Sequence, residues 1–129
     1  MNAQEFFKHK LEFETDSWDL YVALNESRKL VAIDARSAES YEREHIPGAV
    51  SFPHRTMNET SVQCLDRDTL YVSYCDGIGC NASTKGAMKL AALGFQVKEL
   101  LGGLDWWKRD GYATAGAQAQ DGRKLECGC

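Results

Sequence analysis

The sequence predicts an α/β fold in which helices cover both faces of a parallel β-sheet. From residue 30 onward, short apolar runs alternate with helix-like segments, which is the order typical of parallel strands joined by helices. These runs are continuously apolar, as expected for strands buried on both faces. A length of 129 residues is enough for one compact domain. We therefore expect residues 1–129 to form a single domain.

Two helices are expected before the first strand. Residues 3–13 carry apolar side chains at roughly helical spacing, namely Phe6, Phe7, Leu11 and Phe13. A second helix is expected from Asp16 or Ser17, because either residue type can cap a helix N-terminus. Both helices are predicted to cover a face of the domain.

Strands and helices then alternate along the chain. Strands are expected at residues 30–34, 50–52, 69–75 and 97–103. Helices are expected at residues 37–44, capped by Ser37, at residues 82–95, where Gly94 suits the C-terminal end, and at residues 104–111, closed by Gly111. Ligands of such sheets bind at the carboxyl ends of strands, beside helix N-termini. Cys75 ends the predicted strand 69–75 and therefore stands at such a place.

Composition and charge exclude several classes of partner. The net charge of −4 includes no basic stripe, so nucleic acid and anionic membranes are not expected partners. No apolar run approaches the ~18 residues of a membrane span, and the N-terminal residues do not read as a secretory signal. The five cysteines, an odd number, favour a reducing compartment and free thiols, so we expect a cytoplasmic protein. They are Cys64, Cys75, Cys80, Cys127 and Cys129.

The stretch YCDGIGCNASTK, residues 74–85, has the composition of an anion-binding loop. A thiolate is stabilised at a helix N-terminus, and glycines let backbone amides turn toward an anion. Asn81 or Ser83 can cap the helix that follows. The loop therefore suits a thiolate, a persulfide or an oxyanion. A tight strand-to-helix turn with an inert cysteine is the alternative.

Several ordered motifs resemble a single-domain rhodanese, a sulfurtransferase, from about residue 16 to about residue 112. They are Asp34-Ala35-Arg36, EHIPGA at residues 44–49, the strand that ends in Tyr74-Cys75, and GGLDWW at residues 102–107. The resemblance implies a five-stranded parallel sheet and a Cys75 that carries sulfane sulfur as a persulfide. It implies a small sulfur donor, thiosulfate or a persulfide, and a cyanide or thiol acceptor, which could be a protein thiol. It implies no metal and no organic cofactor.

The resemblance also implies site residues around Cys75. Backbone amides of the loop would stabilise the persulfide, as in an oxyanion hole; the loop residues are Asp76, Gly77, Ile78, Gly79, Cys80 and Asn81. Arg36 would form an internal ion pair with a carboxylate such as Asp34 or Glu39. Apart from the resemblance, His54 and Arg55 follow the second strand, so they should lie near the same end of the sheet and could attract an anionic donor.

This loop differs from the common six-residue loop of the family. It is about two residues longer, lacks Arg and Lys, and contains Asp76 and a second cysteine. It is similar to variants with a C-x-G-x-G-C-N pattern. Asp76 is expected to disfavour a thiolate and repel thiosulfate. Cys80, closer to the helix, is an alternative nucleophile or a resolving thiol.

Three other functions compete with sulfur transfer. A phosphatase or arsenate reductase needs an arginine six residues after the cysteine, where Asn81 or Gly86 stands here. Cys75, Cys80, Cys127 and Cys129 could bind zinc, although paired C-x-x-C spacings are missing. The fold could also serve as a non-enzymatic interaction or redox-sensing module using Cys75 and Cys80.

Residues 113–129 are expected to be a flexible tail that ends in Cys-Gly-Cys.

Overall fold

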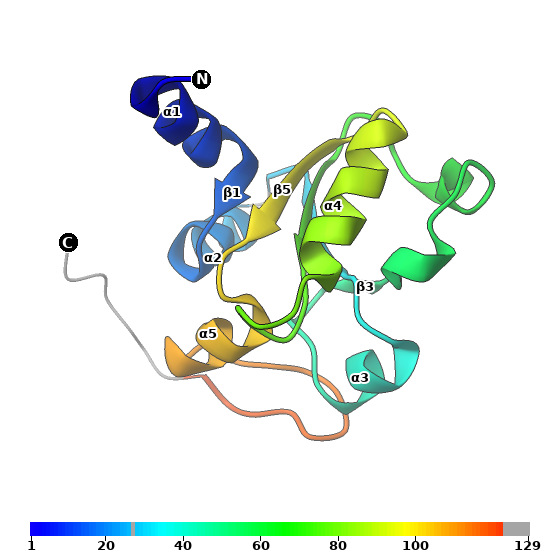
Figure 1. The fold of residues 1–129 in the computed structure, drawn as a ribbon. Coiled ribbons are helices and arrows are strands. Elements are labelled where there is room, and N and C mark those ends of the chain that lie inside the picture. Colours follow the sequence, from blue (N-terminus) through cyan, green and yellow to red (C-terminus); the bar gives the residue numbers. More distant parts are fainter. Residues whose placement is uncertain (27, 123–129) are drawn as a thin grey trace.

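The computed structural model describes residues 1–26 and 28–122. A five-stranded parallel sheet in the order β1-β5-β4-β2-β3 forms its centre (Figure 1). The strands are β1 (Glu14–Thr15), β2 (Leu30–Asp34), β3 (Val50–Ser51), β4 (Leu70–Tyr74) and β5 (Gln96–Leu100). This architecture confirms the predicted α/β fold. The two-residue β1, which pairs with β5, is the one strand that hydropathy did not predict.

Helices lie on both faces of the sheet, as predicted. They are α1 (Ala3–Phe13), α2 (Ser17–Asn25), α3 (Ala38–Arg43), α4 (Ala82–Ala92), α5 (Gly103–Arg109) and the 3₁₀ helices η1 (His54–Thr56) and η2 (Ser61–Cys64). On one face, Leu20 of α2 and Trp107 of α5 pack in one apolar cluster with sheet residues. On the other face, Leu90 of α4 and Val62 of η2 pack in a second cluster. The sheet is therefore buried on both sides.

Strand β4 passes through the middle of the sheet and leads directly to Cys75. Its side chains alternate between the faces: Tyr71 belongs to the cluster beneath α4, and Val72 and Tyr74 belong to the cluster beneath α2 and α5. Strand residues 71–74 are all buried. Because neighbours on both sides hold β4, Cys75 starts from a rigid position at the carboxyl edge of the sheet.

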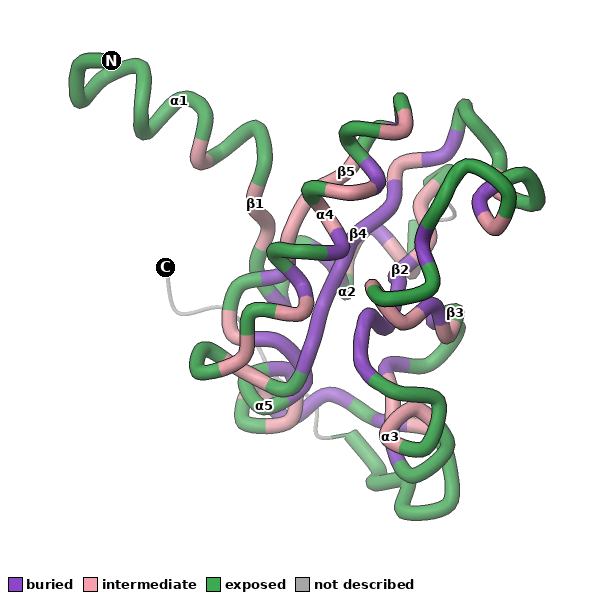
Figure 2. Tube along the Cα trace, turned by 45° about the vertical axis from the view of Figure 1, so that its right-hand side comes forward, coloured by how far each residue is buried: buried purple, intermediate pink, exposed green. Residues whose placement is uncertain are grey.

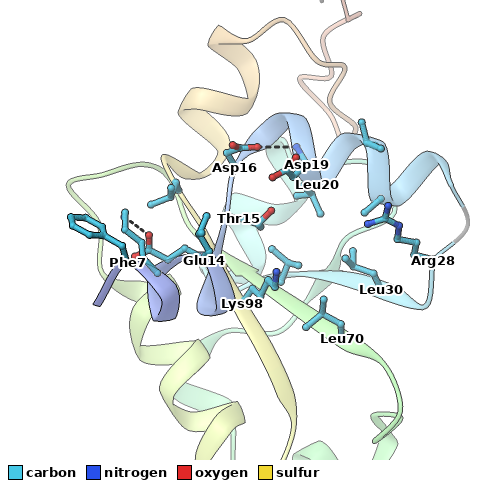
Figure 3. A pocket seen from close by; sticks show the side chains of 16 residues that line it. Phe7, Glu14, Thr15, Asp16, Asp19, Leu20, Arg28, Leu30, Leu70 and Lys98 are labelled. Atoms are coloured by element: carbon cyan, nitrogen blue, oxygen red, sulfur yellow. Dashed lines mark hydrogen bonds and ion pairs between the residues drawn. The ribbon is translucent and has the colours of Figure 1, made fainter. Parts of the chain in front are cut away.

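Helix α1 stands away from the domain, contrary to the prediction that it covers a face (Figure 2). It has no buried residue, and Phe6, Phe7, Leu11 and Phe13 are exposed. One side of α1 borders a cavity of about 700 Å³ between α1, α2 and the sheet. This cavity is lined by Leu20, Leu30 and Leu70 among others (Figure 3). The apolar stripe was correctly recognised, but a stripe does not show what covers it.

The segment after α5 is packed against the domain through residue 120, contrary to the predicted flexible tail. Ala115 exchanges two backbone hydrogen bonds with His45, both 2.9 Å long. The backbone amide of Gln118 donates to the carbonyl oxygen of Arg43. These amides and carbonyls are paired because the segment lies beside the end of α3. Cys127 and Cys129 lie outside the described residues.

Within the described part of the chain, every helix is too short or too polar to cross a membrane.

Candidate active site

The root of the loop after β4 is fastened to the N-terminus of α5. The backbone amide of Leu104 donates to the carbonyl oxygen of Cys75 at 2.9 Å, and that of Asp105 donates to Asp76 at 2.8 Å. Gly103, with φ of +58°, makes this approach possible, because a Cβ there would lie 2.4 Å from the Cys75 oxygen. The GGLDWW motif therefore serves to hold the loop that follows β4.

The Cys75 side chain is buried beneath the loop and the first turn of α4. Only 1% of the residue is exposed. Its Sγ lies 3.0 Å from the carbonyl oxygen of Cys80, 3.5 Å from Ser83 Oγ and 3.7 Å from the carbonyl oxygen of Gly77. Burial raises the pKa of the Cys75 thiol, and hydrogen bonds with Ser83 and Gly77 only partly offset this effect. The enclosed thiol is thus protonated at neutral pH.

The rest of the loop extends toward solvent. Ile78 is 80% exposed, while Cys80 is half-buried and its amide donates to the carbonyl oxygen of Gly77 at 3.1 Å. The side chain of Cys80 contributes to the raised pKa of the Cys75 thiol, so the two cysteines influence each other. Asn81 stands at the N-cap of α4, but its side chain makes no capping bond. Gly79 has no neighbour that a Cβ would meet within 4 Å.

Arg36 forms the predicted ion pair with Asp34 and a further one with the loop. Its guanidinium donates to both carboxylate oxygens of Asp34, at 3.0 and 2.7 Å, and to Asp76 Oδ1 at 2.8 Å. Burial lowers the pKa of Arg36, but these hydrogen bonds outweigh it and raise the pKa. The guanidinium also donates to the carbonyl oxygen of Glu44 at 2.6 Å. The charge of Asp76 is therefore balanced by a cation that the loop itself does not contain.

His54 and Arg55 lie on η1, which packs against α4. The His54 amide donates to the carbonyl oxygen of Ala35 at 3.2 Å, close to the carboxyl edge of the sheet as predicted. Burial and the nearby cations Lys89, Lys85 and Arg55 lower the pKa of His54, so its ring is neutral at pH 7. The expected positive charge at this place thus belongs to Arg55 and to the two lysines of α4.

Sequence reasoning missed a carboxylate next to the loop. Ser83 Oγ donates to Glu99 Oε2 at 2.7 Å, and Thr84 Oγ1 donates to the same oxygen at 2.6 Å. Glu99 lies on β5 and pairs in register with Ser73 of β4. The period of two in a strand places Glu99 on the same face as Val97, which packs beneath α4. An acidic residue on that covered face of the strand was the signal from which a role for Glu99 could have been recognised.

Cys75 lies outside two cavities of the described structure. A polar cavity of about 220 Å³ is lined by Arg36, Asp76, Asp105 and Lys108 among others. Cys75 lines neither this cavity nor the one beside α1. Within residues 1–26 and 28–122, no group of three or more His, Cys, Asp and Glu side chains could hold a metal ion. The four-cysteine zinc hypothesis includes Cys127 and Cys129, which lie outside those ranges.

Comparisons with known proteins agree with this geometry. Residues 17–110 match the rhodanese-like domain. The chain is 33% identical over 95 residues to the thiosulfate sulfurtransferase GlpE of Coxiella burnetii, covering 72% of this chain and 81% of that protein. A solved structure from Bacillus halodurans has a TM-score of 0.85 and 37% identity, covering 92% of this chain and 89% of the other.

A rhodanese-related protein from Thermoplasma volcanium, at 22% identity, has the same fold with a TM-score of 0.69; the match covers 80% of this chain and 97% of that one. One conclusion follows from the parallel sheet of five strands, the cysteine at the end of the central strand and the extent of the matched domain. The chain belongs to the rhodanese-like family, whose relatives here include a sulfurtransferase.

Proposed function

We propose that this protein is a sulfurtransferase that carries sulfane sulfur on Cys75 as a persulfide. The observation that carries the proposal is the position of Cys75 Sγ. It lies at the carboxyl end of β4, buried beneath the loop and the first turn of α4, where hydrogen bonds with Ser83 and Gly77 lower the pKa of the thiol against the effect of burial. Hydrogen bonds that lower this pKa would also stabilise the negative charge of a persulfide, as oxyanion-hole donors do for oxygen. Cys80 lies beside this sulfur, with its carbonyl oxygen 3.0 Å from Cys75 Sγ, and is the candidate resolving thiol.

The proposed chemistry needs two displacements at sulfur. The Cys75 thiolate attacks the outer sulfur of thiosulfate, a new S–S bond forms, and sulfite leaves with the electron pair of the old bond. Cyanide or a thiolate then attacks the outer sulfur of the persulfide and restores the Cys75 thiolate. A persulfide donor would react in the same way with a thiolate as leaving group. No metal or organic cofactor enters either step.

Charge around the loop supports an anionic donor. Asp76 was expected to repel thiosulfate, but Arg36 balances its charge at 2.8 Å. Lys85 and Lys89 of α4 and Arg55 of η1 add positive charge near the same edge of the sheet. These cations replace the arginine or lysine that common loops of the family contain.

The test is intact-protein mass spectrometry after incubation with thiosulfate and, separately, with a persulfide donor. Wild-type protein should gain the mass of one sulfur atom, and cyanide should remove it. The gain should be absent in Cys75→Ser and present in Cys80→Ser. Loss of the gain only in Cys80→Ser would transfer the nucleophile role to Cys80. No gain with either donor would contradict the proposal.

A redox-sensing function is the second candidate, because Cys80 lies beside Cys75: its carbonyl oxygen is 3.0 Å from Cys75 Sγ, and its side chain contributes to the raised pKa of the Cys75 thiol. Mild peroxide would oxidise one thiol to a sulfenic acid, and the other would displace water to form a disulfide. Peptide mapping after peroxide treatment should then show a Cys75–Cys80 disulfide. A sensor without transferase activity would form this bond but gain no sulfur from either donor.

A further inference from the structure

The hydroxyl of Ser83 connects the buried thiol to a carboxylate. Ser83 Oγ lies 3.5 Å from Cys75 Sγ and 2.7 Å from Glu99 Oε2. A serine hydroxyl has one proton, and a carboxylate oxygen can only accept. The short contact therefore directs the Ser83 proton to Glu99. The Ser83 oxygen then faces Cys75 with its lone pairs and can accept the thiol proton.

Ser83 is held in this position from two sides. Its carbonyl oxygen accepts from Ser73 Oγ at 2.9 Å, and its side chain is bound by Glu99, the register partner of Ser73. The residue is buried. Since both anchors lie on adjacent strands, the distance from Ser83 to Cys75 is set by the sheet and not by the exposed loop.

Only one of the three oxygens near the thiol can pass a proton on. The other two are the backbone carbonyls of Cys80 and Gly77, which have no proton to release. The thiol needs a base, since the thiolate is the nucleophile.

We propose that Glu99 accepts the thiol proton of Cys75 through Ser83 when Cys75 attacks its sulfur donor. In this step the thiol proton moves to Ser83 Oγ while the Ser83 hydroxyl proton moves to Glu99 Oε2. The electron pair of the S–H bond stays on sulfur and forms the new bond. Ser83 ends unchanged, and Glu99 ends protonated. The proposal rests on the proposed function only in taking Cys75 as the nucleophile.

The test measures alkylation of Cys75 by iodoacetamide from pH about 6 to 9, with peptide mass spectrometry to resolve this cysteine from the others. Variants are Glu99→Gln, Ser83→Ala and their combination. Thr84→Val is the matched control, because Thr84 binds the same Glu99 oxygen and is not a contact of Cys75. The alkylation rate can be measured without any sulfur transfer. A negative result would therefore count against the role of Glu99 and Ser83 without counting against the proposed function.

Glu99→Gln and Ser83→Ala should each slow alkylation at pH 7 at least about tenfold, a modest share of what general-base catalysis can supply. The double variant should be no slower than either single one, because both changes interrupt one path. Below pH about 8 the wild-type rate should depend weakly on pH, whereas the variants should gain about tenfold per pH unit. Thr84→Val should behave as wild type.

Three results would overturn the proposal. Faster alkylation in Glu99→Gln would show that Glu99 acts only as a negative charge that disfavours the thiolate. Additive losses in the double variant would show two separate effects. An equal loss in Thr84→Val would show that Glu99 acts only by holding the start of α4. If Glu99→Gln does not fold, Ser83→Ala alone decides between a shallow and a steep pH profile.

Discussion

Arg36 joins two carboxylates that differ strongly in exposure. Asp34 is fully buried, whereas the Asp76 side chain is 69% exposed. A buried charge that loses its partner is costly, but an exposed one is solvated by water. The same guanidinium therefore stabilises the fold through its pair with Asp34 and balances the charge of the loop through its pair with Asp76.

Arg36→Met should lower the free energy of unfolding by about 3–5 kcal/mol, because Asp34 remains buried without its cation. Asp76→Ala should lower it by less than about 1 kcal/mol, because that pair is largely solvated. Urea unfolding at pH 7 measures both. Equal losses in the two variants would contradict the separation of roles.

The contacts of single residues could be predicted from sequence only where the partners are close along the chain. Asp34 and Arg36 are two residues apart on a motif of the family, and their pairing was expected. Glu99 is far from Cys75 in sequence and comes close only through the register of β4 and β5. Asp76 was recognised as an acid, but its partner was not, since Arg36 follows a different strand.

At the level of elements, the start of α5 supports the loop more than the start of α4 does. Two α5 amides bind the carbonyl oxygens of Cys75 and Asp76, and this contact depends on the absence of a side chain at Gly103. Asn81 gives α4 no side-chain cap. The loop root and α5 should therefore unfold together.

Gly103→Ala should destabilise the protein by about 2–4 kcal/mol, from a strained positive φ and a clash with the Cys75 oxygen. Gly48→Ala is the matched control. Gly48 has φ of +82° but nothing within 4 Å of its Cβ position, so only strain of about 1–2 kcal/mol applies. Thermal unfolding compares them, and equal shifts would mean that α5 does not hold the loop.

Elements with continuous apolar runs were predictable, and those defined by packing were not. The runs of β2 and β4 and the Gly94 end of α4 stand where the sequence placed them. The predicted strand 97–103 ends earlier, at Leu100, because Gly102 turns the chain into α5 with a φ of +77°. For α1, hydropathy revealed an apolar side but could not show whether the domain covers it.

Across the whole molecule, Glu44 connects three distant segments. Glu44 lies directly after α3. Its carboxylate accepts from Lys108 Nζ of α5 at 2.8 Å and from Thr114 Oγ1 at 2.6 Å. Burial raises the pKa of Glu44, but these hydrogen bonds outweigh it and hold the pKa below its ordinary value of 4.5. Residues 113–120 are therefore part of the folded domain.

Glu44→Gln should lower the free energy of unfolding by about 1–3 kcal/mol at pH 7, while Glu42→Gln, at an exposed position within α3, should change it by less than about 0.5 kcal/mol. A lowered folded-state pKa gives stability that is present above pH 4.5 and is lost as pH falls through the folded value. Urea unfolding curves of wild type and Glu44→Gln should thus converge with acidification below pH about 4.5. A constant difference across this range would exclude Glu44 as the titrating link.

The loop is fixed at its root and open at its tip, and this has a consequence for how the family can diversify. Cys75 and Asp76 are bound by α5, while Ile78 and Gly79 extend into solvent. Chain added at an exposed tip costs little free energy, because loop closure depends weakly on length. Evolution, or a protein engineer, can therefore exchange the tip for another sequence while Cys75 stays where the sheet puts it.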